Sequence, residues 1–228
     1  MPIRTRLPIT FFFLCGSASL LIGQSNPTAK GATAKKAPVV AASATLVFTP
    51  PAPSGKADEF LSALRAISDE YKTYELSDSR TETQVREMSV YVANDVKGFA
   101  KTDAPPGIIA NGKPLDDQAR AQITATLLRS IRAYINKRCR FVDQANIKVV
   151  VMLSGAANET YIGSDGFSTF GIINIKLFLV DTKLKRVIWY TDKAWGTGKS
   201  VPQATDFASE SIAGQLDKLF GVIETQKK

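Results

Sequence analysis

Histidine is absent from all 228 residues, and this restricts the chemistry that the side chains can perform. Ser-His-Asp and Cys-His centres and histidine-based metal sites all need that residue. A base would have to be a lysine or a carboxylate. The aspartates fall mainly at predicted turns or helix starts: Asp103, Asp116, Asp117, Asp165, Asp181 and Asp192. We therefore expect no catalytic residue, no metal and no cofactor. A hydrolase that acts on cell-wall polymer through two carboxylates stays as an alternative.

One short motif is similar to a phosphate-binding loop. Gly198-Lys-Ser200 follows a predicted strand and opens a predicted helix. Such a loop needs another glycine five residues before Gly198, so that the backbone can curl round the phosphates, but Lys193 occupies that position. The motif is therefore expected to be the start of a helix.

Aromatic side chains gather in a glycine-rich segment, 155–171, which we expect to be a long loop or a loose hairpin connection. Tyr161, Phe167 and Phe170, together with Trp195, are the candidate partner-contact residues, because loops with exposed aromatic rings often carry recognition. Two alternatives stay open: the 161–171 loop binds carbohydrate or lipid, or its rings pack onto the sheet.

The elements that must position these residues follow from the spacing of apolar residues. Steps of three and four predict helices near 56–72, 116–137 and 201–220. Strands are expected at 85–96, with a helix from Glu82 as competitor, and at 147–153. A β-hairpin is expected near 172–191. The fold class is therefore α/β (α+β): a two-layer sandwich with a mixed sheet of about four or five strands.

The N-terminus is typical of a secretory signal peptide over residues 1–25. Arg4 and Arg6 precede a mostly apolar run, and small residues such as Gly23 and Ser25 follow it. We expect an exported protein of the bacterial cell envelope, periplasmic or outer-membrane-associated, with secretion as the alternative. An uncleaved anchor and a lipidated Cys15 are the competing interpretations.

Residues 26–55 are rich in Pro, Ala and Lys and are expected to be a linker to a single domain at 56–228. Lys30, Lys35 and Lys36 allow weak contact with an anionic membrane or wall polymer. No aromatic residues interleave with these lysines, so we expect no nucleic acid partner. After cleavage Cys139 is the only cysteine left, which excludes an intramolecular disulfide and favours a buried thiol.

Three strings carry a resemblance to a known group. Residues 147–155 form an apolar strand that ends in glycine, and 174–189 form a hairpin with an Asp turn and an Ile-Trp strand. Residues 204–219 form a closing helix with spaced alanines. Over about residues 85–220 the chain resembles the envelope α/β superfamily of curli-secretion channel subunits, penicillin-binding-protein activator lipoproteins and TolB-amino-terminal-like domains. The resemblance implies a non-enzymatic envelope module that binds a protein partner or assembles with itself.

Overall fold

The computed structural model describes residues 44–77, 80–94, 108–109, 116–163 and 166–222, and from 157 to 169 it describes the backbone alone. All of these residues belong to one compact unit, 39–228. The expected signal peptide, 1–25, lies outside the described residues, and so do Cys15, Lys30, Lys35 and Lys36.

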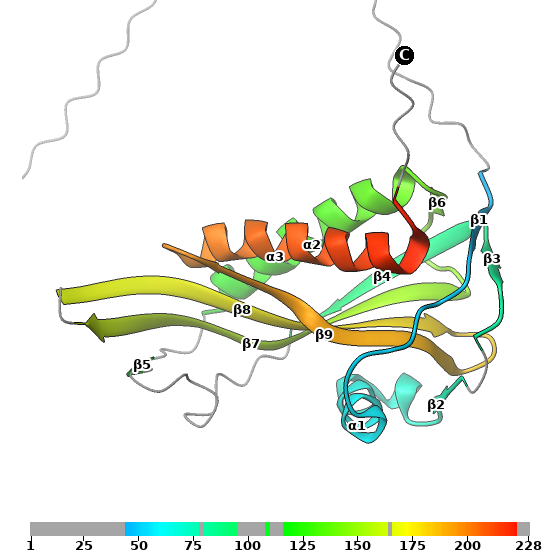
Figure 1. The fold of residues 1–228 in the computed structure, drawn as a ribbon, viewed down its shortest axis with the longest axis horizontal. Coiled ribbons are helices and arrows are strands. Elements are labelled where there is room, and N and C mark those ends of the chain that lie inside the picture. Colours follow the sequence, from blue (N-terminus) through cyan, green and yellow to red (C-terminus); the bar gives the residue numbers. More distant parts are fainter. Residues whose placement is uncertain (1–43, 78–79, 95–107, 110–115, 164–165, 223–228) are drawn as a thin grey trace, which may run out of the picture. The chain divides into compact units, whose positions relative to one another are not determined.

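A mixed sheet forms the centre of this unit (Figure 1). Its strands run in the order β2 (Glu75–Leu76), β9 (Arg186–Gly198), β8 (Gly166–Asp181), β7 (Ile147–Gly163), β4 (Glu87–Ala93) and β6 (Arg140–Phe141), and β5 (Ile108–Ile109) pairs with β7. The neighbours β7, β8 and β9 are antiparallel, whereas β4 is parallel to both β7 and β6. The expected mixed sheet and α/β sandwich are confirmed. The sheet has seven strands where about four or five were expected, because β2, β5 and β6 are two-residue strands too short to show an alternating pattern, and helices lie on both of its faces where two layers were expected.

Helices cover both faces of the sheet. Val149 and Val151 of β7 pack in one apolar cluster with the helices α2 (Asp117–Asn136) and α3 (Val201–Phe220). Val150, between them, faces the opposite way and packs with α1 (Ala57–Ile67) and the 3-10 turn η1 (Asp69–Tyr71). Because side chains alternate along a strand, the continuous β-branched run predicts a strand covered on both faces, as found (Figure 1).

The two long helices follow their predicted bounds closely. The inner stripe of α2 places an apolar residue at every fourth position: Ile123, Leu127, Ile131 and Ile135. Asp116 caps this helix, with its Oδ1 accepting the N–H of Ala119 at 2.7 Å. Ser200 caps α3 in the same way, accepting the N–H of Gln203 at 3.4 Å. The shorter α1 ends at Ile67 because Ser68 is extended, and η1 continues to Tyr71.

The end of the segment expected to be a linker takes part in the fold. β1 (Leu46–Phe48) pairs with β3 (Thr83–Val85) in a small antiparallel ladder. Phe48 is buried, and its ring meets that of Phe220 edge-to-face at 4.8 Å. The helix that competed for residues 85–96 does not form, since β3 ends at Val85 and β4 spans Glu87–Ala93.

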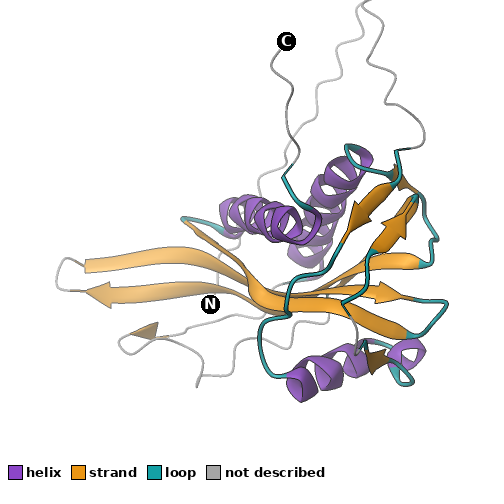
Figure 2. Cartoon of the chain, turned by 45° about the vertical axis from the view of Figure 1, so that its right-hand side comes forward, coloured by secondary structure: helices purple, strands orange, loops and turns teal. Residues whose placement is uncertain are grey.

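Of the two alternatives expected for 155–171, the long loop is wrong and the hairpin is closer to the structure. β7 and β8 continue through this segment as a paired hairpin, and their pairing runs on to Gly163 and Gly166 (Figure 2). The glycines of this segment indicated a loop, but Gly155 lies at a register shift inside the ladder. The β-branched and aromatic residues between the glycines favour strands, and their propensity prevails here.

Candidate functional site

The distal half of the β7–β8 hairpin forms an arm, which we define as residues 158–163 and 166–170. Pairing between β8 and β9 ends at Gly171 and Gly198, so within the described residues the β8 side of the arm pairs with β7 alone. On the β7 side, pairing with β4 stops at Met152, and among the described residues only Ile108 and Ile109 of β5 pair further out. The arm therefore extends past the end of β9 and carries backbone groups that no described strand pairs with (Figures 1 and 2).

The predicted contact residues are distributed along this arm and at its base. Tyr161 lies on β7 and Phe167 on β8, but their side chains lie outside the described part of the structure. Phe170 is half-buried. Trp195 of β9 is 56% exposed and pairs with Asn174 of β8, four residues along that strand from Phe170. Four strand residues span about 13 Å, so the ladder places Trp195 near the base of the arm.

At residues 193–199, beyond its short pairing with β2, the outer edge of β9 is closed by side chains of helix α3 instead of a further strand. The N–H of Trp195 donates to the Oγ of Ser211 at 3.3 Å. The Nε2 of Gln215 donates to the carbonyl oxygen of Lys193 at 3.3 Å, and the N–H of Lys199 donates to the Oε1 of Gln203 at 2.7 Å. These bonds satisfy edge groups that would otherwise be open to another strand, and they fix the backbone on both sides of Trp195.

Three glycines allow α3 to lie this close to the sheet. A Cβ added to Gly196 would lie 2.1 Å from the carbonyl oxygen of Ala204. One added to Gly171 would lie 2.6 Å from the backbone of Ser200, and one on Gly198 would lie 2.8 Å from the nitrogen of Ala204. The Gly-Lys-Ser motif is therefore the end of β9 followed by a helix cap, as expected from the missing glycine at Lys193.

The other aromatic residues near Trp195 in the sequence are core residues. Trp189 and Tyr190 of β9 are both buried, but they point to opposite faces of the sheet. Phe178 packs with Phe60 and Tyr190 beneath α1. On α3, Phe207 is 47% exposed and lies one turn before Ser211, which bonds the backbone of Trp195. Sequence reasoning missed Phe207, because an exposed aromatic residue on an amphipathic helix gives no distinct signal.

The structure places two carboxylates in one polar cleft, where β4 begins and the β8–β9 turn lies. Glu87 and Asp181 both line this cleft, which has a volume of about 510 Å³. Glu87 forms an ion pair with Arg140 at 3.2 Å. The Oδ1 of Asp181 accepts the N–H groups of Lys183 and Leu184, each at 2.9 Å, as a turn-forming aspartate does. Both carboxylates are thus engaged in structural contacts.

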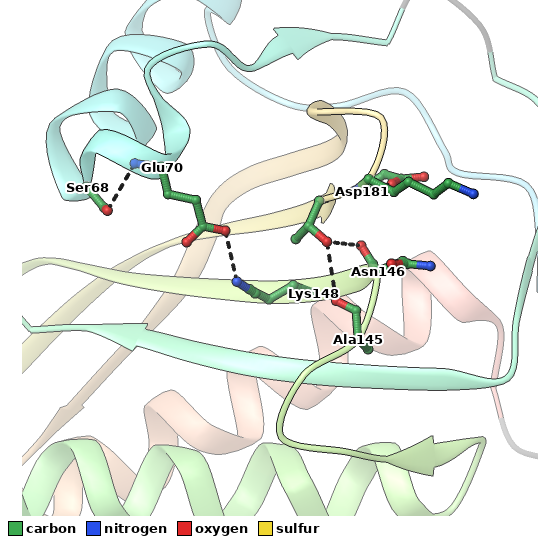
Figure 3. Close-up of polar contacts among 8 residues, drawn as sticks. Ser68, Glu70, Ala145, Asn146, Lys148 and Asp181 are labelled. Carbon is green, nitrogen blue, oxygen red and sulfur yellow. Dashed lines mark hydrogen bonds and ion pairs between the residues drawn. The ribbon is translucent and has the colours of Figure 1, made fainter.

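Further polar contacts hold the same end of the sheet. The N–H of Thr182 donates to the carbonyl oxygen of Asn146 at 2.7 Å, and this bond ties the β8–β9 turn to the loop before β7. The Nζ of Lys148 bonds Glu70 at 3.1 Å, which links β7 to η1 (Figure 3). These contacts join elements of the fold, so the polar residues at this cleft have structural roles.

The remaining aspartates named from the sequence do not converge on a site. Asp116 caps α2, Asp117 lies exposed in its first turn, and Asp192 is exposed on β9. Asp103 and Asp165 lie outside the described residues. Within the described part of the chain, no three His, Cys, Asp or Glu side chains gather as a metal site would require. Nor does any helix there combine the length and apolar character needed to cross a membrane.

A buried ion pair that sequence reasoning missed joins the C-terminal ends of α2 and α3. Arg138, whose side chain is 5% exposed, bonds the Oδ1 of Asp217, which also accepts the hydroxyl of Tyr134 at 2.6 Å. Burial, and then the bond to Asp217, raise the pKa of Tyr134. Beside them Cys139 is buried as expected, and burial raises the pKa of its thiol to about 11. These residues form a structural clamp between the helices.

Comparisons with known proteins give only distant likenesses. No family model and no curated protein matches the chain. A PelC dodecamer from Paraburkholderia phytofirmans has 14% identity, covers 78% of this chain and 97% of its own, and has a TM-score of 0.35. A second PelC dodecamer structure has 15% identity, coverages of 59% and 87%, and a TM-score of 0.34. A DUF330 protein from Xanthomonas campestris has 12% identity, coverages of 64% and 95%, and a TM-score of 0.23. TM-scores this low assign no function.

Proposed function

We propose that this chain is a non-enzymatic exported module of the cell envelope, which binds a protein partner or assembles with itself through the arm and Trp195. The observation that carries the proposal is the arm itself: a hairpin that runs past β9, with backbone edges left open by the part of the chain that the structure describes and an exposed tryptophan at its base. Exposed strand edges and exposed aromatic rings are features that protein interfaces use. Export follows from the signal-peptide pattern of residues 1–25.

The way Trp195 is held supports a binding role. A large apolar side chain exposed to water contributes little to stability, whereas a rigid aromatic anchor binds at a low cost in conformational entropy. The bond from its N–H to Ser211 and the close contact of Gly196 with α3 fix the backbone that carries the ring. The resemblance to the envelope α/β superfamily belongs to the same proposal, since such domains are not generally enzymes.

The carboxylate alternative finds little support in the polar cleft. A hydrolase of this type needs one carboxyl group free to donate a proton and another free to act as base or nucleophile. In the cleft, Glu87 pairs with Arg140, and Asp181 accepts two backbone N–H groups of its own turn. We therefore favour partner binding over hydrolysis.

Crosslinking in cells followed by purification from the envelope fraction tests this function. The tagged chain should recover a discrete partner or a crosslinked form of itself. The variant Trp195→Ala should recover clearly less. Leu184→Ala is the matched control, since Leu184 is 61% exposed but lies in the β8–β9 turn, away from the arm. Recovery of neither a partner nor a self-complex from the unaltered chain would overturn the proposal.

A further inference from the structure

A groove with mixed apolar and basic walls lies between α2 and the strand β4, apart from the arm. Its volume is about 640 Å³. Val90, Leu128 and Phe141 give it apolar walls, and Arg129, Arg132 and Asp143 are its charged lining residues. Grooves between a helix and an edge strand suit extended peptides, which add a strand to the sheet and place side chains against the helix.

The backbone of β4 is open along this groove. Arg86 and Met88 direct their carbonyl groups toward β6, where they accept N–H groups from Arg140 and Val142, each at 3.0 Å. Because backbone groups alternate in direction along a strand, Val90 and Val92 direct theirs to the same side. β6 ends at Phe141, paired with Met88, so nothing within the described residues pairs with this side of Val90 and Val92. This edge can therefore accept another strand.

The charge of the groove selects among such strands. Arg129 and Arg132 are three residues apart and so share one face of α2. Both are exposed, and within the described residues neither guanidinium forms an ion pair. The guanidinium of Arg132 lies 4.6 Å from the centre of the Phe141 ring, which holds it over the groove. The groove also holds one carboxylate, Asp143, but neither arginine forms an ion pair with it, so positive charge prevails and favours acidic groups in the occupant.

We infer that this groove binds an extended acidic peptide of another protein as an added strand along β4. Main-chain bonds to Val90 and Val92 give the peptide its register. Apolar side chains directed at α2 rest near Val90 and Leu128, and an acidic side chain on the same face reaches Arg129 and Arg132. This surface goes beyond the proposed function, because it neither includes nor requires the arm or Trp195.

Selection from a random library of linear peptides of about 12 residues, displayed against the purified chain, tests the inference. We expect enrichment of sequences with an acidic and an apolar residue two positions apart. A synthetic peptide of the enriched sequence, amidated at its C-terminus, should bind R129E/R132E at least about tenfold more weakly. The variant K183E/K193E carries the same charge change at exposed positions outside the groove and should bind normally.

Two further measurements make the result specific. Two N-methylated peptides should differ. Methylation of the amides that face β4 should abolish binding, whereas methylation of the amides between them, which face away, should not, as strand addition requires. W195A should bind the peptide normally, which separates failure of this inference from failure of the proposed function. The inference is overturned if no acidic sequence is enriched, if both charge variants lose binding equally, or if methylation has no effect. Arginine-dependent binding of polygalacturonate without any selected peptide would assign the groove to an anionic polymer and also overturn it.

Discussion

The backbone N–H of Trp195 lies 3.3 Å from the Oγ of Ser211 and donates a hydrogen bond to it. One bond therefore ties β9 to the middle of α3 and fixes the backbone of a ring that is itself 56% exposed. A strand segment sealed by helix side chains cannot easily be extended by a further strand, so under the proposed function the contact at this end of the sheet is made by the ring and by the arm beyond it.

Replacement of Ser211 by alanine tests this tie. The N–H of Trp195 would lose its protein acceptor but could bond water, so we expect a loss of about 0.5–1 kcal/mol in the free energy of unfolding. Partner recovery should fall more than this small loss of stability explains. Ser209→Ala is the control, because the Oγ of Ser209 bonds the Thr205 carbonyl of its own helix and no other group among the described residues. Urea unfolding measures the stability, and crosslinking measures the recovery of the partner. Equal partner recovery by both variants would contradict a role for the Trp195–Ser211 bond in binding.

Two glycines give opposite predictions for one substitution. In Gly196→Ala the new Cβ would lie 2.1 Å from the carbonyl oxygen of Ala204, so β9 and α3 must separate. We expect a loss of about 1–3 kcal/mol. In Gly214→Ala nothing lies within 4 Å of the new Cβ, and alanine favours the helix, so stability should rise by about 0.5–1 kcal/mol. Urea unfolding of both variants checks the signs; a harmless Gly196→Ala would mean that α3 does not lie this close to β9.

The ion pair between Arg138 and Asp217 predicts that replacing the half-buried Asp217 lowers the free energy of unfolding substantially. Asp217→Ala leaves the guanidinium of Arg138 without its carboxylate partner, and the Arg138 side chain is only 5% exposed. We expect a loss of about 2–3 kcal/mol, less than for a fully buried pair because the Asp217 side chain is 37% exposed. Arg138→Met combined with Asp217→Leu should recover much of the loss. A cost below about 0.5 kcal/mol for Asp217→Ala would show that the pair is solvated.

The thiol of Cys139 predicts a loss of stability in alkali. Burial raises the pKa of Cys139 from 9.0 to about 11. Below pH 9 the thiol is protonated in both the folded and the unfolded chain. As the pH rises from 9 toward 11, the thiol ionises only in the unfolded chain, and this ionisation favours unfolding. The full difference corresponds to about 3 kcal/mol.

Cys139→Ala serves to isolate this effect from the titration of lysines and tyrosines. The variant should be less stable at neutral pH, because it leaves a small cavity. Between pH 8.5 and 11 it should lose less stability than the unaltered chain. Parallel pH dependence of the two proteins, followed by urea unfolding, would show that the thiol is not buried from solvent.

Local sequence patterns predicted the strands and helix starts whose formation depends on neighbouring residues. The β-branched run from Val149 to Val151 predicts a strand covered on both faces, and Gly198-Lys-Ser200 predicts the start of α3; both are confirmed. The glycines of 155–171 were misleading, because a glycine serves a loop, a register shift or a close contact equally well. Gly171 shows the last case, since its Cβ would meet the backbone of Ser200.

The features that define the candidate sites depend on contacts across the chain. Arg138 and Asp217 are 79 residues apart, and nothing in either local sequence indicates the other. The seal of β9 by Ser211 and Gln215 depends on where α3 crosses the strand. The open edge of β4 at Val90 exists because β6 ends at Phe141, and no sequence pattern shows which strands become neighbours.

Photo-crosslinking from position 195 tests the central claim most directly. A benzoylphenylalanine in place of Trp195 should give discrete adducts in cells that produce the chain, either with one partner or with a second copy. The same residue in place of Leu184, which is 61% exposed at the β8–β9 turn, should give few. No adduct from position 195, or equal labelling from both positions, would contradict the claim that the arm and Trp195 form the contact surface.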